Sequence, residues 1–285
     1  MITIRDIVAW RQHAPWSNDL QVEQDLRLTR AMVAIFSDGF LSSQVAMRGG
    51  TALHKVHLAP AARYSEDIDL VLVGDRPEDH IQRALRRVLA PILGEPEFDL
   101  VETVRLAVRN LFKPSRVIRQ VYPYKPISGL QSIARVKVEV NVTERVPFFD
   151  VIDLPVTFPV TSGTPSAITL RSYDIDEMIG TKMRALLQRD QGRDLFDLWW
   201  AISAPAPDGF LPLRPDRAVA AFQEYMSREG TAVSYELYAQ ELQRKLRLPS
   251  FSNDLNGMLR QGVPVFDPQS AANEVVESLL RPLDG

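Results

Sequence analysis

The sequence predicts a mixed α/β (α+β) fold, with a mixed β-sheet domain over residues 1–165 and a helical domain over residues 166–285. Two strand patterns carry the first part of this prediction. The stretch Asp67–Val73 is almost wholly apolar after its second acid, as in a buried strand. Residues Ile133–Val140 alternate between apolar and polar, as in a strand with one buried face. Near residue 165 these patterns give way to helical spacing, which predicts a helical second part.

Composition restricts the classes of protein to which the chain can belong. The 285 residues carry a formal net charge of -3, so a basic nucleic-acid binder is excluded for the chain as a whole. There is no cysteine, which excludes disulfides and thiolate metal sites. No apolar run approaches the ~20 residues needed to cross a bilayer, and the N-terminus lacks a signal-peptide pattern. We expect a cytoplasmic protein that does not contact membranes.

The first half of the chain begins with an amphipathic helix. It is expected to start after Ser17 or Asn18, either of which can cap it, to continue to Phe36 and to end at Gly39. The next elements are expected in this order: a strand over Gln44–Met47, a turn at Gly49-Gly50, a helix over Thr51–Leu58, a strand over Asp67–Val73 and a helix over Pro77–Leu93, for which Pro91 offers an earlier end.

The second half changes from strands to helices. The expected elements are strands between Phe98 and Thr143, a loop-rich joint at Pro155, Pro159, Ser162, Gly163 and Pro165, helices over Asp174–Gln191 and Arg193–Ile202, a proline-rich linker over Pro205–Pro215, and short helices beyond it.

Asp67 and Asp69 form the most informative local pattern. Two carboxylates one residue apart on a strand point to the same face, where they repel each other unless a cation lies between them. Mg²⁺ takes such oxygen ligands, often together with substrate phosphates. The alternative is a pair of solvated or turn-capping acids, but the apolar run that follows them favours a central strand, and ligands bind at the ends of such strands.

Two further features extend this pattern. Gly49 and Gly50 precede the acids and would allow backbone N–H groups to approach a phosphate, with Thr51 as the nearest hydroxyl. Glu139 lies on an alternating strand and could complete a two-metal site with Asp67 and Asp69. The alternative for Glu139 is an exposed strand face on which it lies beside Lys137.

The helical half offers a basic stripe and an acidic pair. Lys182 and Arg189 lie seven residues apart on one helix face, where Lys182 could reach a triphosphate or simply be solvated. Asp194 and Asp197 share a face of the next helix, and Arg193-Asp194 could be a structural pair between the two helices. The four histidines show no ligand spacing and are expected to be ordinary core or surface residues.

Between Glu102 and Glu139 the sequence contains no acid. This stretch carries basic residues with interleaved aromatics, a pattern that favours contact with the phosphates and unpaired bases of a nucleic acid. The alternative is a set of strands whose basic face pairs with acids elsewhere. The residues proposed to contact nucleic acid are Arg105, Arg109, Lys113, Arg116 and Arg119.

Taken in order, these segments resemble the AbiEii/AbiGii toxin family of nucleotidyltransferases, within the DNA polymerase β-like superfamily. The segments that carry the resemblance are Val22–Leu26, Arg48–Leu53, Ser65–Leu70, Lys137–Asn141, Asp176–Arg189 and Arg193–Asp197. The resemblance covers about residues 20–200. Two departures from the superfamily are visible, because Gly49-Gly50 replaces the frequent Gly-Ser and Glu139 replaces the more usual Asp.

The resemblance implies a nucleotidyltransferase core, Mg²⁺, an NTP and an acceptor hydroxyl, which is expected to lie on RNA and specifically on tRNA. It further implies a toxin with a cognate antitoxin protein as its partner. The implied metal ligands are Asp67, Asp69 and Glu139, which with Lys182 and Asp194 form the catalytic set. The implied NTP-binding residues are Arg48, Gly49, Gly50, Thr51, Ser65, Lys182 and Arg189. Two alternatives stay open: nucleotidylation of a protein, such as AMPylation, and a non-catalytic nucleotide-binding module.

Overall fold

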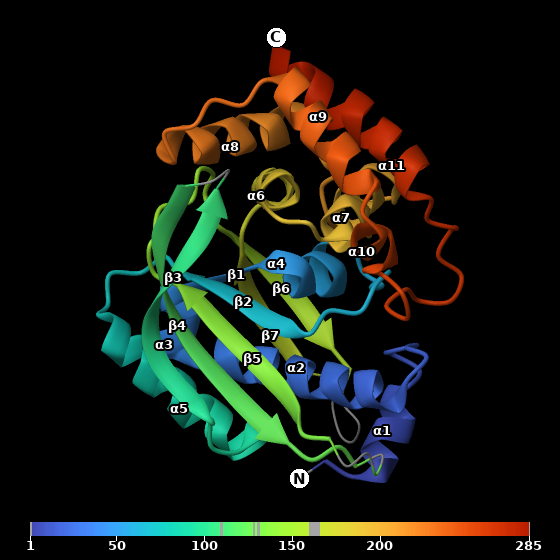
Figure 1. Cartoon of the computed structure of the whole chain (residues 1–285). Coiled ribbons are helices and arrows are strands. Elements are labelled where there is room, and N and C mark those ends of the chain that lie inside the picture. The colour runs from blue at the N-terminus through green and yellow to red at the C-terminus, as the bar shows by residue number, and fades with distance from the viewer. Residues whose placement is uncertain (1, 109–110, 128, 130–131, 160–165, 285) are drawn as a thin grey trace.

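The fold is built around one mixed sheet (Figure 1). The structure is a computed structural model that describes residues 2–108, 111–127, 129, 132–159 and 166–284. Within these ranges seven strands are hydrogen-bonded in the order β3-β4-β5-β2-β1-β7-β6. The strands are β1 (Val45–Arg48), β2 (Asp67–Leu72), β3 (Phe98–Val108), β4 (Leu111–Tyr124), β5 (Ala134–Asn141), β6 (Ile152–Phe158) and β7 (Ser166–Ser172).

The strand β2 lies near the middle of this sheet. It pairs antiparallel with β1 and parallel with β5, so both of its edges are occupied. The side chains of Ile68, Leu70, Val71 and Leu72 are buried, as the apolar run predicts. The predicted central position of the Asp67–Val73 strand is therefore confirmed.

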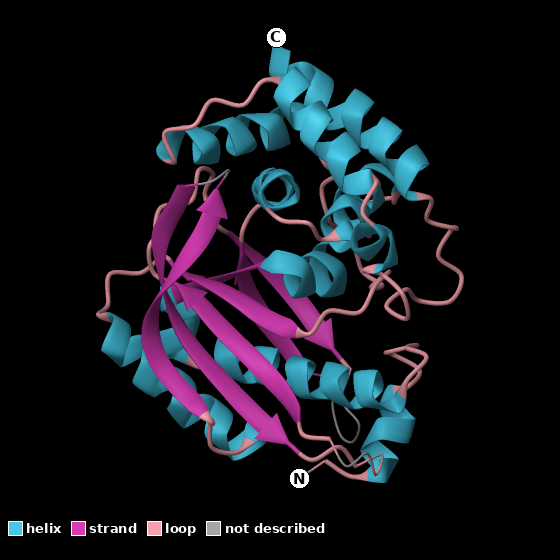
Figure 2. Cartoon of the chain, in the orientation of Figure 1, coloured by secondary structure: helices cyan, strands magenta, loops and turns pink. Residues whose placement is uncertain are grey.

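Helices cover one face of the sheet and continue beyond it in a separate group (Figure 2). The helices are α1 (Ile4–Trp10), α2 (Asp19–Ser37), α3 (Gly39–Gln44), α4 (Gly49–Ala52), α5 (Glu78–Leu93), α6 (Ile175–Gln188), α7 (Gly192–Ser203), α8 (Pro215–Arg228), α9 (Tyr235–Leu246), α10 (Pro249–Asn253) and α11 (Pro268–Val275). Short turns of other helix types are η1 (Leu53–His57), η2 (Val276–Leu280) and η3 (Arg281–Asp284). No helix in the described part of the chain is long and apolar enough to span a bilayer.

Several predicted elements need correction at their ends. The helix α2 begins after Asn18, whose side chain accepts a hydrogen bond from the N–H of Leu20, as expected. Gly39 does not simply end that helix, because the side chain of Asp38 caps a new helix, α3, that begins at Gly39. The helix α5 runs through Pro91 and ends at Leu93, as predicted, so the earlier end at Pro91 is not used; α1 was not predicted.

The loop-rich joint predicted from Pro155 to Pro165 is wrong at its first residue. Pro155 lies inside β6, which pairs antiparallel with β7 and forms an edge of the sheet. Proline is tolerated there because an edge strand has one row of N–H groups without a partner strand. Ser162, Gly163 and Pro165 lie outside the described residues. Since β7 belongs to the sheet, the change from strands to helices falls after Ser172, and the division into two domains remains a proposal.

The helical part packs most closely where α6 crosses α8. Gly180 lies on the buried side of α6, and a Cβ atom added there would lie 2.8 Å from the carbonyl oxygen of Ala218 and 2.9 Å from the nitrogen of Phe222. Both are backbone atoms of α8 that cannot turn away. Gly180 therefore sets how closely α6 approaches α8.

We expect Gly180→Ala to lower the free energy of unfolding by about 1–2 kcal/mol, because overpacking outweighs the gain in helix propensity. Gly39→Ala is the matched control, since a Cβ atom there meets nothing within 4 Å. Urea unfolding of both variants measures the difference. A Gly180→Ala protein as stable as the wild type would contradict this account of the contact.

Candidate active site

The register of the sheet places the predicted carboxylates on one face. Asp69 lies directly opposite Glu139 of β5 on one side and opposite Arg48 of β1 on the other. Asp67 lies two residues earlier on the same face, opposite Lys137. The three carboxylates come from two neighbouring strands and therefore gather at one position on the sheet.

The turn between β1 and α4 closes over Asp69. Gly49 has a φ of 79°, and a Cβ atom there would lie 2.2 Å from Oδ2 of Asp69. Glycine is required here for both reasons. Thr51 is buried, and its hydroxyl lies 2.9 Å from the hydroxyl of Ser65 and donates to the carbonyl of Asp67 at 2.5 Å. Thr51 thus ties the turn to the start of β2 and does not face the cavity.

The surroundings of Asp67 and Asp69 disfavour the ionised form of these carboxylates. Burial raises the pKa of Asp69, and the charges of Asp67 and Glu139 raise it further. Burial also raises the pKa of Asp67, although Lys137, whose Nζ lies 3.0 Å from Oδ2 of Asp67, opposes this. A cation between the carboxylates would relieve both effects.

The three carboxylates are suitable ligands for a hard divalent cation, but two of them contact Arg119 and Lys137 in this structure. Arg119 donates to Oε1 of Glu139 at 2.6 Å, and Nζ of Lys137 lies between Asp67 and Glu139. Among the described residues, no three His, Asp or Glu side chains are already gathered closely enough to hold an ion. A metal ion at Asp67, Asp69 and Glu139 would therefore take the place of the ammonium and guanidinium contacts.

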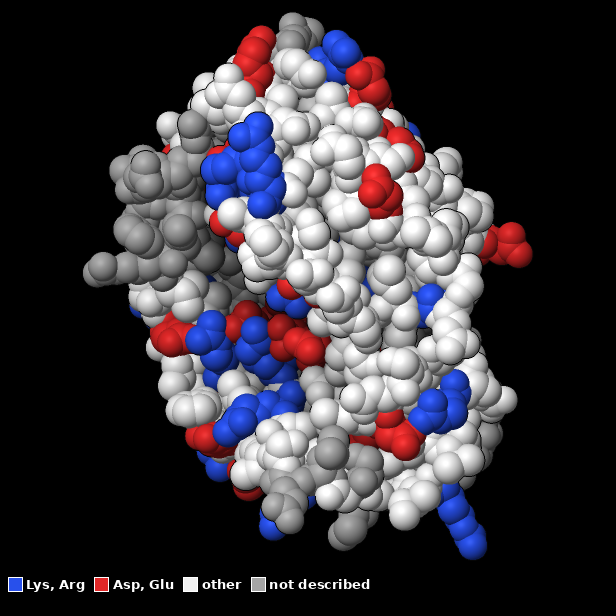
Figure 3. All heavy atoms as spheres, turned by 45° about the vertical axis from the view of Figure 1, so that its right-hand side comes forward, with Lys and Arg blue, Asp and Glu red and all other residues white. Residues whose placement is uncertain are grey.

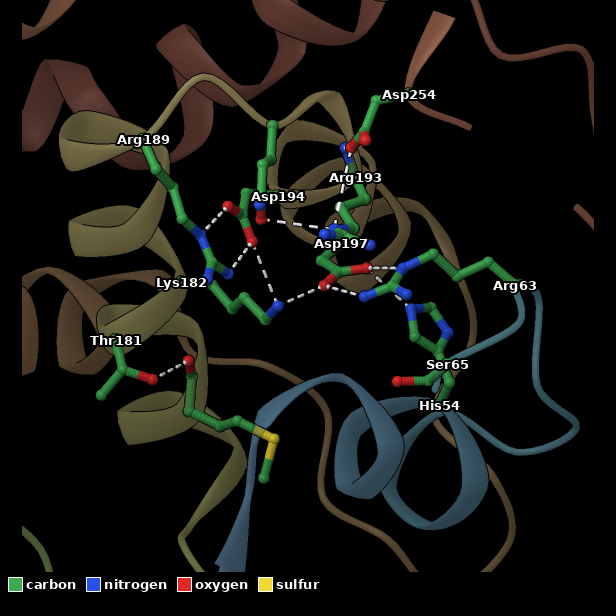
Figure 4. A network of polar contacts seen from close by, with 12 residues as sticks. His54, Arg63, Ser65, Thr181, Lys182, Arg189, Arg193, Asp194, Asp197 and Asp254 are labelled. Carbon is green, nitrogen blue, oxygen red and sulfur yellow. Dashed lines mark hydrogen bonds and ion pairs between the residues drawn. The ribbon is translucent and has the colours of Figure 1, made fainter. Parts of the chain in front are cut away.

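Asp197 of α7 is buried, and three basic side chains from other parts of the chain contact its carboxylate (Figure 4). Arg63 donates to its two oxygens at 2.6 and 2.7 Å, Nζ of Lys182 lies 2.7 Å away, and Nε2 of His54 lies 2.8 Å away. Burial opposes ionisation, but Arg63 and Lys182 hold the pKa of Asp197 well below its usual range. Burial lowers the pKa of His54 to about 4, so its ring is neutral at pH 7 and Nε2 donates to Asp197.

Asp194, one turn earlier on α7, accepts hydrogen bonds from Lys182 and Arg189, the two predicted basic residues. Lys182 donates to its Oδ1 at 3.2 Å, and Arg189 donates to both of its oxygens at 2.6 and 2.8 Å. Together with Asp197 and Arg63, this cluster holds three cations against two carboxylates, while His54 is neutral. The cluster carries an excess positive charge, which suits an anionic ligand.

A second ion cluster lies behind Asp69. Arg48 donates to Glu144 at 2.6 Å, and Glu144 also accepts from Arg184 of α6 at 2.6 Å. Burial opposes ionisation, but Arg48 and Arg184 lower the pKa of Glu144 to about 2. Arg48, predicted to bind an NTP directly, is thus held by Glu144, and it does not line the cavity described next.

Lys245 of α9 holds the end of α6. Its buried Nζ donates to the carbonyls of Leu187 and Arg189 at 2.9 Å each, and to that of Leu186. These are carbonyls at the C-terminal end of the helix, where a cation is favoured. Lys245 therefore fixes the segment from which Lys182 and Arg189 project.

The sheet group and the cation cluster face each other across a cavity of about 200 Å³. Figure 3 shows basic and acidic side chains gathered in a hollow on this face of the molecule. The predicted site residues that line the cavity are Gly50, Ser65, Asp67, Asp69, Glu139, Lys182 and Arg189. Gly49, Thr51 and Asp194 lie behind this lining and hold it in place.

Arg116 and Arg119, the two members of the predicted basic surface whose side chains are described, both form ion pairs. Arg116 forms an ion pair with Glu78 at 2.6 Å, and Arg119 pairs with Glu102 and Glu139. Arg109 lies outside the described residues. Arg105 and Lys113 lie on β3 and β4, whose backbone is described there but not the side chains. The role of these residues in binding nucleic acid remains a proposal.

Sequence reasoning missed several residues that hold the site together. Asp197 was noted only as a neighbour of Asp194, whereas Arg63, Glu144 and Lys245 were not singled out. His54 was predicted to be an ordinary core or surface residue, and it is a buried, neutral residue whose bond to Asp197 was not predicted. An acid within an apolar helix face, such as Asp197 among Leu195, Phe196 and Leu198, was the one available signal that a buried partner existed.

Comparisons with known proteins agree with this architecture. A family model described as "Nucleotidyl transferase AbiEii toxin, Type IV TA system" matches residues 30–278. The MenT4 nucleotidyltransferase toxin of Mycobacterium tuberculosis H37Rv is similar in structure, with a TM-score of 0.57, 16% identity, and 99% of each chain covered. JHP933 from Helicobacter pylori superposes with a TM-score of 0.49 and 15% identity over 94% of each chain. No curated protein sequence matches.

We expect Asp197→Asn to lower the free energy of unfolding by about 3–5 kcal/mol, since it leaves buried cations without their counter-ion. Asp153→Asn is the matched control, because Asp153 is half exposed and pairs with Arg171 at the surface, where such pairs contribute about 0–1 kcal/mol. Urea unfolding compares the two variants. Equal, small losses would contradict the central role of Asp197.

The Glu144 cluster predicts a dependence of stability on pH. Because the folded-state pKa of about 2 lies below the ordinary value of 4.5, its stabilisation is complete above pH 4.5 and is lost as the pH falls from there toward 2. We expect Glu144→Gln to lower the free energy of unfolding at pH 7 by about 3 kcal/mol. The difference from the wild type should shrink as the pH is lowered below 4.5, as unfolding curves measured at several pH values will show. A difference independent of pH would contradict the assignment.

Proposed function

The chain belongs to the nucleotidyl transferase AbiEii toxin family of type IV toxin–antitoxin systems, and on that premise we propose its reaction. As a member it is a nucleotidyltransferase that uses an NTP, with an antitoxin as partner. The proposed reaction is Mg²⁺-dependent transfer of a nucleotidyl group from the NTP to a hydroxyl of RNA, specifically tRNA, in the cytoplasm. The acceptor oxygen bonds to the α-phosphorus, the bond to the β-phosphate oxygen breaks, and pyrophosphate leaves.

One observation supports this proposal above the others. The acidic face formed by Asp67, Asp69 and Glu139 and the excess positive charge around Lys182 and Arg189 lie on opposite walls of one cavity. A triphosphate with bound cations needs such a pair of surfaces, because its metal ions require carboxylates and its phosphate oxygens require cations. A structural ion network alone does not require an open cavity between the two groups.

Each wall has a distinct task in the proposed reaction. Asp67, Asp69 and Glu139 would hold Mg²⁺, which supplies neutralisation of charge at the reacting phosphate. Lys182 and Arg189 bind phosphate oxygens, while Asp194 keeps both side chains extended toward the cavity. Gly49 and Gly50 let the backbone of the turn approach the phosphates, and Ser65 lines the cavity beside them. Catalysis on this account consists of positioning and charge stabilisation.

The test is incubation of the purified protein with each α-labelled NTP, Mg²⁺ and total tRNA. We expect label in tRNA and a loss of about 100-fold or more in the Asp67→Ala variant, because a charge-stabilising group is removed. Asp75→Ala is the control, since Asp75 follows β2 and its side chain is 90% exposed. Chelation of Mg²⁺ should abolish transfer.

Other outcomes identify the alternatives. Label in protein instead of tRNA would replace the RNA acceptor with a protein acceptor, as in AMPylation. Metal-dependent NTP binding with no transfer to either acceptor would indicate a non-catalytic module. Equal labelling by the wild type and the Asp67→Ala variant would overturn the assignment of the carboxylates.

A further inference from the structure

A second and larger hollow of about 800 Å³ adjoins the catalytic cavity. We call it the acceptor groove and define it by Phe98, Leu100, Arg119, Val121, Arg135 and Lys137. Glu66, Asp67 and Lys137 line both hollows, so the groove opens into the catalytic cavity at the carboxylates. A molecule lying in the groove can therefore deliver one end to the reacting centre.

The sheet arranges the groove in two rows that lead to the carboxylates. Phe98, Val121, Lys137 and Asp67 lie opposite one another on β3, β4, β5 and β2. The next row contains Leu100, Arg119, Glu139 and Asp69. Three strand spacings of about 4.8 Å place Phe98 roughly 14 Å from Asp67. A group bound at Phe98 is thus separate from the reacting hydroxyl but within reach of the same ligand.

Two apolar side chains of the groove are exposed, because no helix covers them on this face of the sheet. Phe98 is 49% exposed and Leu100 is 37% exposed, although both lie in regular strand. Helices α2 and α5 pack on the sheet, yet this face of β3 stays open. An exposed aromatic ring on an open strand surface is the usual platform for a nucleic-acid base.

Cationic side chains line the groove beside this platform, together with the acids Glu66, Asp67 and Glu102. Arg119 lies in the second row, Lys137 separates Val121 from Asp67, and Arg135 borders the groove with its guanidinium 3.1 Å from Glu97. Aromatic surface flanked by guanidinium and ammonium groups suits a chain that alternates flat bases with phosphates. A peptide segment would not need repeated cations along its path.

We propose that the acceptor groove binds the unpaired end of the RNA acceptor, with a base stacked on Phe98 and the terminal hydroxyl at Asp67 and Asp69. The inference rests on the proposed function and adds to it the side from which the acceptor enters. The NTP occupies the smaller cavity between the carboxylates and Lys182, and the RNA enters from the side of β3, β4 and β5. The base on Phe98 is unpaired in the bound state, because a base inside a duplex has both of its faces covered by neighbouring pairs.

The test measures binding and turnover in Phe98→Ala. With a fluorescein-labelled single-stranded RNA of about ten nucleotides, we expect the Kd from anisotropy to rise about 5- to 100-fold, the loss of one stacked base. The KM for tRNA should rise by a similar factor while the KM for the NTP stays unchanged. Phe98→Tyr, which keeps the ring, should restore binding. Phe148→Ala is the matched control, since Phe148 is also a partly exposed phenylalanine but does not line the groove.

The outcomes separate this inference from the proposed function. If the wild type labels tRNA and Phe98→Ala binds RNA as the wild type does, the groove assignment is overturned and the proposed function stands. If the wild type transfers no label to RNA, the proposed function fails and the inference with it. Equal binding of the RNA decamer and its duplex would overturn the requirement for an unpaired end. Circular dichroism of Phe98→Ala confirms that the half-exposed position tolerates the change.

Discussion

The buried carboxylate of Asp197 is the constraint on which the site depends. It lies on α7 but accepts from η1 through His54, from the segment before β2 through Arg63, and from α6 through Lys182. A carboxylate with no exposure needs these partners, and the partners in turn cannot be left alone in the interior. The helices and the sheet are therefore not free to pack independently. The ion cluster that satisfies burial also places the basic wall of the cavity opposite the acidic one.

The position of the acidic wall depends on the register of β2 in the sheet. The face of β2 opposite to Asp67 and Asp69 carries Ile68 and Leu70, which are buried. A slip of one residue would bury both acids and expose the apolar pair, so the hydrophobic core holds the acids on the open face. Parallel pairing with β5 then adds Glu139 beside Asp69. The like charges of the site are thus held together by apolar burial, and their mutual repulsion creates the demand for a cation.

What could be predicted from the sequence was local. The strand Asp67–Val73 and the glycine turn follow from spacing within a few residues, and the structure forms both. The predicted stripe of Lys182 and Arg189 is only partly right, because α6 ends at Gln188 and Arg189 follows it in extended backbone. The partners could not be predicted, because Arg63 and Asp197 lie 134 residues apart in the chain and no spacing rule connects them. The acid-free stretch shows the same limit. Glu102 and Glu139, the acids that bound it in sequence, both pair with Arg119 across neighbouring strands, and no spacing rule predicts these contacts.

The attachment of Lys245 to the end of α6 makes the basic wall depend on a residue that is translated after both walls. All residues of the two walls are translated before residue 200. Lys245, whose ammonium group holds the end of α6, is translated 45 residues or more afterwards. A chain that stops before Lys245 would contain the residues of both walls but would leave the last carbonyls of α6 without this cation. The basic wall would thus reach its final arrangement only after α9 has joined the fold.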